Sequence, residues 1–322
     1  LEWAADLIEQ EAEATLMRGE IATLLRWVDV LSDELVRLRP SLCAYHAWAL
    51  LMSGRPWETV RSRLEDVDRE ADLIPGKAAP LHALIAILQG HMPRAAELAR
   101  QALEQLPEGD LFLRSLAIWN LALFSADDDI VAGVRALEEA AKMSQEAGNV
   151  TIATMMLCNL AELTIKQGHL LEARTVYRRA LDLAVDRQGR RLPIAGDALI
   201  GLGDLAREWN DLEMATRYLT EGIELAGQLG QARALEGYIY LAHVRQAQGD
   251  VDGAREAIQK ARQLAIEFDA TELDDIMVEF HQAQLWITQG SLKSARRWTE
   301  ERGLDSDVDP AQLRQADAFV QD

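Results

Sequence analysis

Cysteine, proline and glycine are scarce in this chain, and each scarcity narrows what the chain can be. Only 2 of its 322 residues are cysteine, so neither a disulfide framework nor a zinc site is expected. Cys43 and Cys158 are interpreted as small apolar core residues in a reducing compartment. Only 8 prolines and 20 glycines interrupt the sequence, so helix is expected almost throughout.

Long apolar runs and an excess of positive charge are also missing. No stretch approaches the roughly 20 apolar residues of a membrane-spanning helix, and Leu1 opens into helix-like sequence without a signal peptide. A cytoplasmic chain with no membrane contact is therefore expected. The formal net charge is -20, from 53 acidic and 33 basic residues. Such a surface repels phosphate backbones, so no direct nucleic-acid contact is expected from this segment.

The residues that are present form an internal repeat. With 49% hydrophobic and 27% charged residues, the chain can bury a large core. Small or polar residues break the helical pattern at spacings of 35, 36, 38, 40, 42, 39 and 41 residues. The breaks are Gly19, Gly54, Gly90, Asp128, Gly168, Asn210, Gly249 and Gly290. This spacing predicts an all-α, right-handed superhelical solenoid of about eight tetratricopeptide-like (TPR-like) helix-turn-helix repeats.

The helix after five of the breaks carries an alanine five positions on, which lets paired helices approach closely. These residues are Ala95, Ala173, Ala215, Ala254 and Ala295. The solenoid is predicted to cover residues 1–302. Residues 303–322 are interpreted as a linker and the start of a further, truncated helix.

The breaks themselves have the chemistry of helix ends. Glycine favours the left-handed conformation that ends a helix, and the Asp, Ser or His that follows it is suited to capping the next helix. The triplet 127–129 is interpreted as a turn with an N-cap rather than a calcium site, because no further ligands have the spacing of a calcium loop.

In a solenoid of helix pairs, the first helices line the concave face. Projecting the repeat pattern places mixed acids, bases, amides and aromatics toward this groove, which suits a polar small molecule or a peptide. The projected residues are Trp48, Glu162, Lys166, Asp204, Arg207, His243, Gln246, Phe280, Gln284 and Ile287. The alternative is that these are ordinary solvated side chains with some salt bridges between repeats.

Catalytic and metal-binding motifs are not found. None of the six histidines forms an i, i+4 pair or a known ligand motif, and His243 is the one projected into the groove. No G-x-x-x-x-G-K-[ST] phosphate-binding motif occurs, so no ATP site is assigned to this chain. The sequence predicts neither an enzyme nor a bound cofactor or metal.

Four stretches carry a resemblance to a known family. They are LRPSLCAYHAWALLMSGRPWETVRSRLEDVD (38 to 68), LAELTIKQGHLLEARTVYRRALDLA (160 to 184), LGDLAREWNDLEMATRYLTEGIELAGQLG (202 to 230) and GYIYLAHVRQAQGDVDGAREAIQKARQLA (237 to 265). The chain resembles the TPR-like sensor region of ATP-dependent, LuxR-type transcriptional regulators related to MalT. The resemblance implies an ATP-binding module before the solenoid and a DNA-binding helix-turn-helix after it, both outside these residues.

The resemblance further implies that the solenoid receives a small-molecule inducer or a regulatory protein and communicates with other domains of the same regulator. A free-standing TPR scaffold that docks peptides or proteins is the alternative. A phosphate-binding motif upstream and a helix-turn-helix downstream would distinguish the first hypothesis from the second.

Overall fold

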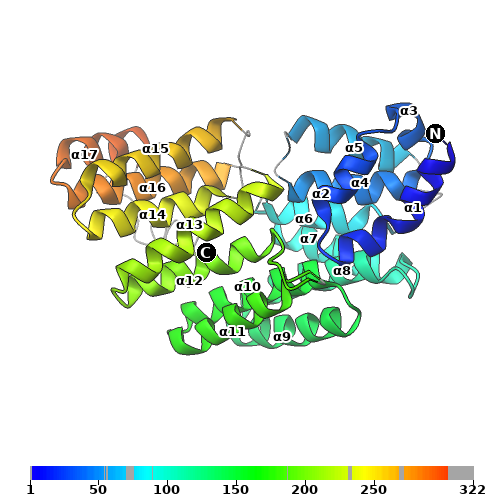
Figure 1. Cartoon of the computed structure of the whole chain (residues 1–322), viewed down its shortest axis with the longest axis horizontal. Coiled ribbons are helices and arrows are strands. Elements are labelled where there is room, and N and C mark those ends of the chain that lie inside the picture. Colours follow the sequence, from blue (N-terminus) through cyan, green and yellow to red (C-terminus); the bar gives the residue numbers. More distant parts are fainter. Residues whose placement is uncertain are drawn as a thin grey trace.

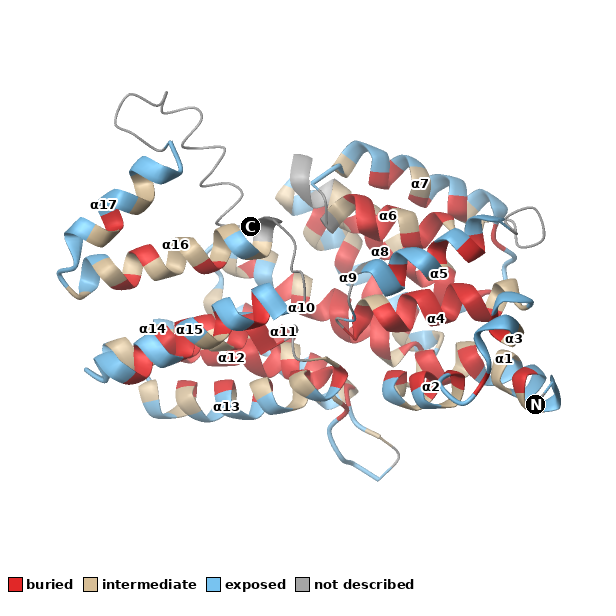
Figure 2. Cartoon of the chain, turned by 90° about the horizontal axis from the view of Figure 1, so that it is seen from above, coloured by how far each residue is buried: buried red, intermediate tan, exposed pale blue. Residues whose placement is uncertain are grey.

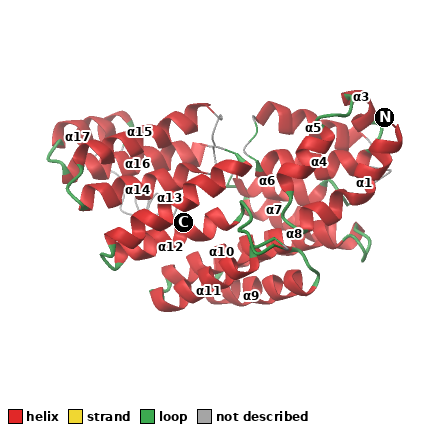
Figure 3. Cartoon of the chain, viewed as in Figure 1, coloured by secondary structure: helices red, strands yellow, loops and turns green. Residues whose placement is uncertain are grey.

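The computed structural model describes residues 2–53, 55, 57–69, 76–88, 90–186, 188–230, 234–267 and 272–303. These residues form 17 helices, and the regular structure drawn in Figure 3 is helical throughout. The all-α solenoid predicted from the repeat spacing is confirmed. The predicted terminal segment, from residue 304 onward, lies outside the described residues.

Sixteen of the helices form eight antiparallel pairs that follow one another along the chain (Figure 1). The first helices of the pairs are α1 (Glu2–Met17), α4 (Pro40–Met52), α6 (Ala79–Leu88), α8 (Leu111–Asp128), α10 (Val150–Lys166), α12 (Ala195–Glu208), α14 (Leu235–Ala247) and α16 (Glu272–Thr288). The second helices are α2 (Ile21–Val28), α5 (Trp57–Arg69), α7 (Met92–Gln105), α9 (Ile130–Glu146), α11 (Leu170–Leu183), α13 (Leu212–Leu229), α15 (Val251–Glu267) and α17 (Leu292–Glu301). A short helix, α3 (Asp33–Arg37), precedes α4.

The turns within the pairs have the backbone conformation that the break residues favour. Gly19, Gly90, Gly168, Gly249 and Gly290 have φ between 73 and 82°, and Asn210 has φ of 59°. At the fourth pair, Asp129 caps α9 by accepting hydrogen bonds from the amides of Val131 at 2.9 Å and Ala132 at 3.2 Å. The predicted N-cap is therefore confirmed at Asp129, whereas the first two aspartates of the triplet belong to the end of α8 rather than to a turn. Gly54 lies outside the described residues.

The alanines predicted at the contact between paired helices are buried. Ala95, Ala173, Ala215 and Ala254 have no exposed surface, and Ala295 is 7% exposed. Leu219 and Ile258 are also fully buried on the second helices. The first helices are buried over more of their circumference than the second helices, as Figure 2 shows for α10 against α7 and α13. The second helices therefore form the outer layer of the solenoid.

The N-terminal pair also contacts pairs that are remote in sequence. The Thr151 hydroxyl in α10 donates a hydrogen bond of 2.6 Å to the Leu16 carbonyl in α1, across 135 residues. At the turn between α1 and α2, a Cβ on Gly19 would lie 3.0 Å from Leu192 Cδ1. In addition, α2 contacts α13. The N-terminal pair is thus held against the middle of the solenoid, and we call this set of contacts the closure contact.

Within the described parts of the chain, no helix combines the length and apolarity needed to cross a bilayer.

Candidate functional site

A cavity of about 470 Å³ lies on the side of the solenoid formed by the first helices. Side chains from α8, α10, α12, α14 and α16 line it, so five successive pairs contribute. A volume of this size falls in the range of small-molecule sites, roughly 300–1,000 Å³. The arrangement agrees with the sequence-based prediction that first helices line the groove.

Acidic side chains dominate the cavity. Its lining includes five carboxylates and, among the described residues, one lysine. The carboxylates are Glu162, Asp197, Asp204, Glu236 and Asp274, and the lysine is Lys166. They come from α10, α12, α14 and α16, so the acidic character is shared across four repeats. A concave surface with one sign of charge focuses its field into the cleft.

Burial alters the ionisation of three of these carboxylates, Glu162, Asp204 and Glu236. Burial raises the pKa of Glu236 to about 7, and the negative charge of Glu162 adds to the effect. Burial likewise raises the pKa of Glu162, opposed by the Asn159 amide and the Lys166 ammonium. Glu162 and Glu236 are both exposed at the mouth of the cavity, and the surrounding protein atoms displace part of the water that would stabilise their charges.

Asp204 has a local counter-ion. Its Oδ1 accepts a 2.7 Å hydrogen bond from Arg207 Nε, one turn further along α12. Burial nonetheless raises the pKa of Asp204, with Arg207 opposing the shift. Part of the charge at this wall of the cavity is therefore neutralised within the helix itself.

A tyrosine from the outer layer reaches the cavity by packing against a glycine of α12, where there is no side chain to block it. Tyr177 belongs to the second helix α11, is 3% exposed, and lines the cavity. A Cβ on Gly201 would lie 2.2 Å from Tyr177 Cζ and 2.5 Å from its hydroxyl oxygen. The missing side chain at Gly201 therefore provides the space for the tyrosine ring, and any larger residue there must displace it.

A histidine pair extends the lining at α14 and α16. His243 Nε2 lies 2.9 Å from His281 Nδ1, and that atom lies 3.1 Å from Gln284 Oε1. Burial lowers the pKa of His243 to about 3 and that of His281 to about 4. Both rings are therefore neutral at pH 7, so one ring donates and the other accepts in the hydrogen bond between them.

The residues projected into the groove from the sequence divide into three groups. Glu162, Lys166 and Asp204 line the cavity, and Arg207 is bound to Asp204. His243, Phe280 and Gln284 gather around His281, which Phe280 meets edge-on at a centroid distance of 5.5 Å. The third group lies further along the same helices: Gln246, whose Oε1 accepts from Gln289 Nε2 at 2.8 Å, and Ile287, which is 55% exposed. Ligand contact by all of these residues stays a prediction.

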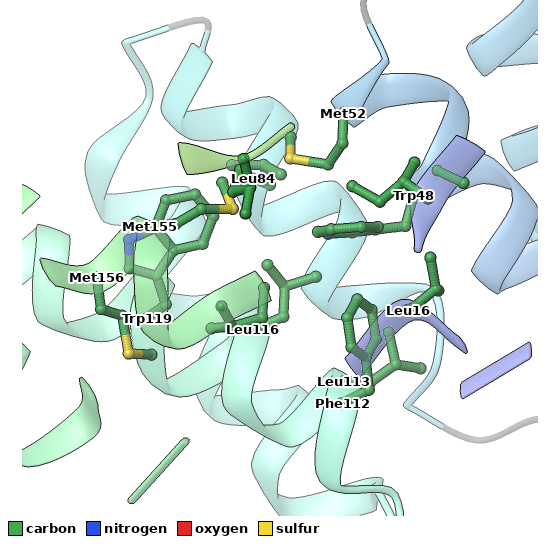
Figure 4. Close-up of a cluster of buried hydrophobic side chains, with 14 of the residues drawn as sticks. Leu16, Trp48, Met52, Leu84, Phe112, Leu113, Leu116, Trp119, Met155 and Met156 are labelled. Atoms are coloured by element: carbon green, nitrogen blue, oxygen red, sulfur yellow. The ribbon is translucent and has the colours of Figure 1, made fainter. Parts of the chain in front are cut away.

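The projection of Trp48 into the groove is wrong. Trp48 has no exposed surface, and its ring meets that of Phe112 edge-on at a centroid distance of 4.7 Å. Figure 4 shows it among Leu16, Leu113 and Met52 in the hydrophobic core. The reason is that α4 is enclosed by α1, α2, α5 and α6 and has few positions that reach solvent.

Sequence reasoning missed most of the cavity lining, because it projected only Glu162, Lys166 and Asp204 of the lining residues. Glu236, Tyr240 and His281 are on first helices but were not projected inward, and Tyr177 comes from a second helix, where no groove residue was expected. For His281 a signal existed, because it follows His243 by 38 residues, close to one repeat. Among the residues that the structure describes, no group of three or more His, Cys, Asp or Glu side chains is arranged to hold a metal ion.

Comparison with known proteins agrees with this architecture. The fold matches a Rap protein in complex with competence and sporulation factor, with a TM-score of 0.64, 14% identity, and coverage of 94% of this chain and 88% of that one. It also matches the Cut9–Hcn1 assembly of the APC/C, with a TM-score of 0.61, 15% identity, and coverage of 88% and 50%. The fold and its inner cavity define a helical-repeat domain of the tetratricopeptide class.

The family follows from sequence. The model of the MalT-like TPR region matches residues 76–320, and the chain belongs to this family. Curated relatives include the HTH-type transcriptional regulator MalT of Yersinia pestis (strain Pestoides F), 23% identical over 268 residues and 80% of this chain. MalT of Yersinia enterocolitica is 24% identical over 267 residues. The chain spans about 30% of the length of these relatives.

Proposed function

We propose that this chain is the sensing module of a MalT-type transcriptional regulator, and that a ligand in the inner cavity controls the activity of the longer protein. The observation that carries the proposal is the cavity itself, which draws its lining from five successive repeats. A ligand that touches all five stabilises one relative arrangement of the repeats over others. Its binding energy thereby becomes a bias between conformations of the regulator.

The same proposal assigns chemistry to other parts of the regulator. ATP binding and DNA binding belong to modules beyond the matched region, as in regulators of this family. This chain acts by binding rather than by catalysis. Membership of the MalT-like TPR family and the helical-repeat fold support this assignment.

A ligand screen with a cavity variant tests the proposal. Thermal unfolding of the 322-residue chain is followed with neutral sugars, organic anions, organic cations and short peptides. A ligand that binds the folded state alone raises the melting temperature in a saturable way. We expect at least one such ligand, and we expect its effect to be reduced in Glu162→Gln.

The control is Glu104→Gln, which removes the same charge from an exposed position on α7, away from the cavity. A ligand effect that is lost equally in both variants, or no saturable ligand in any class, argues against a sensing role for the cavity.

A peptide or protein partner in the same groove is the second candidate function. The Rap structure that shares this fold contains competence and sporulation factor, and helical-repeat grooves present extended binding surfaces. A peptide hit in the screen, with no effect from any small molecule, favours this scaffold function over inducer sensing.

A further inference from the structure

The lining of the cavity restricts the chemistry of its ligand. Building on the sensing function proposed above, we infer that the cavity binds a small organic cation: an ammonium or guanidinium group on a carbon body. Glu162 of α10 and Glu236 of α14 form its cationic subsite, and Tyr177 of α11 faces the same subsite.

The charge of the cavity is the first argument. The negative charge of Glu162 raises the cost of ionising Glu236, and Asp204 shares the same lining. An anionic ligand would add to this repulsion. A cation placed between the two glutamates relieves it, and partial exclusion of water strengthens the attraction.

Tyr177 is an independent observation that points to a ligand. The residue is only 3% exposed, and its hydroxyl lies over Gly201 at the cavity lining. Among the described residues its hydroxyl has no hydrogen-bond partner, and it borders the cavity rather than being fully enclosed by protein atoms. Burial raises the pKa of Tyr177 well above the ordinary tyrosine value, and the negative charges of Glu162 and Glu236 raise it further. A cavity ligand supplies the missing partner.

Aromatic walls suit a cation with a carbon body. Trp119, Tyr177 and Tyr240 line the cavity together with Met155 and Met277. Aromatic faces attract alkylammonium and guanidinium groups, and the apolar groups accommodate a carbon chain. A cavity of about 470 Å³ fits a small molecule completely, whereas a longer peptide would extend out of it.

Calorimetry on the whole chain tests the inference. The probes are 1,6-diaminohexane, its uncharged analogue 1,6-hexanediol, and the blocked tripeptide acetyl-Ala-Lys-Ala-amide. We expect saturable binding of the diamine with one site per chain and no heat from the diol. We expect Glu162→Gln and Glu236→Gln each to weaken diamine binding about tenfold or more, because a charge-assisted contact is lost.

Two controls separate the cavity from general attraction to an acidic protein. Glu104→Gln removes one exposed carboxylate elsewhere and should leave diamine affinity unchanged. Tyr177→Phe keeps the ring and removes the hydroxyl, so a reduction of about threefold or more tests the subsite without a change in charge. Circular dichroism confirms that each variant is folded before it is titrated.

The outcomes distinguish this inference from the proposed function. Equal diamine affinity in Glu104→Gln, Glu162→Gln and Glu236→Gln overturns the cationic subsite. Preference for the tripeptide over the diamine overturns a small-molecule ligand. A neutral sugar or an anion that binds the cavity and is weakened by Glu162→Gln overturns the cationic ligand while the sensing function stands.

Discussion

At the residue scale, the absence of a side chain at Gly201 of α12 leaves the space that the Tyr177 ring of α11 occupies. The ring of Tyr177 lies where a Cβ on Gly201 would be. Glycine within a helix costs roughly 1 kcal/mol relative to alanine, so α12 gives up some intrinsic stability at this position. In return, the Tyr177 side chain of the outer layer can pack against Gly201 and line the inner cavity.

The Gly201→Ala substitution tests this relation. We expect it to destabilise the protein by about 1–3 kcal/mol, because overpacking outweighs the gain in helix propensity. Urea unfolding provides the measurement. Gly109→Ala is a control for the added methyl group alone, since Gly109 lies in a turn where a Cβ meets nothing within 4 Å. Adding Tyr177→Leu to Gly201→Ala should restore part of the lost unfolding free energy. If Gly201→Ala alone costs no stability, the Tyr177 ring can move aside without cost, and the prediction is wrong.

Glu236 makes stability depend on pH. Its pKa rises from 4.5 to about 7 on folding, so the folded state holds a proton that the unfolded state releases. Its favourable contribution is fully present below pH 4.5 and is lost as the pH rises through about 7. The groups that face it are Glu162 from α10, Asp197 and Asp204 from α12, and Tyr240 from its own helix.

We therefore expect Glu236→Gln to become progressively more stable relative to the wild type between pH 5 and pH 8. The two unfolding curves are compared at each pH, because the buried neutral pair His243 and His281 gives an opposite slope below pH 6.5 in both proteins. Glu104→Gln should show no such divergence. A constant difference between wild type and Glu236→Gln across this range contradicts the shift.

Residue positions were the hardest part to predict from sequence. Glu162, Lys166 and Asp204 follow from the repeat register, because a polar residue at an inward position of a first helix has one direction available. The direction of the Trp48 side chain could not be predicted, because α4 is apolar on all sides and has no polar stripe that would show which face is outward. Tyr177 could not be placed inward from its own helix, because the space for it is created by a glycine in another helix.

At the scale of helices, most of the structure could be predicted. The break residues carry a local preference for left-handed backbone or for capping, and these preferences act without tertiary contacts. The short helix α3 could not be predicted from the repeat, because it is an addition to the first pair. The same holds for the connection between α11 and α12, where Val185 and Arg191 form an antiparallel bridge.

Helix capping provides a prediction at this scale. Asp211 accepts a hydrogen bond of 3.1 Å from the Met214 amide at the start of α13. We expect Asp211→Ala to cost about 1 kcal/mol of unfolding free energy, measured with urea. Ser291 stands at the same position before α17 but its side chain makes no capping hydrogen bond, so Ser291→Ala should be nearly neutral. Equal effects would show that the capping bond does not contribute.

At the scale of the whole molecule, the closure contact joins the first pair to the middle of the solenoid. Thr151→Val removes the hydroxyl that binds the Leu16 carbonyl and should cost about 1 kcal/mol. Amide hydrogen exchange should then accelerate in α1 as well as in α10. Thr175→Val is the control, because its hydroxyl binds the Leu171 carbonyl within a single helix. If amide exchange in α1 is unchanged in Thr151→Val, the closure contact does not stabilise the first pair.

The closure contact also has a consequence for biosynthesis. A repeat array that contacts only its neighbours has low contact order and can fold as each repeat leaves the ribosome. Here the partner of Leu16 lies 135 residues further along the chain, so the first pair is made long before its docking site exists. Until α10 emerges, the surface of the first pair that docks there stays uncovered, so it needs protection by a chaperone for longer than a contact between neighbouring repeats does.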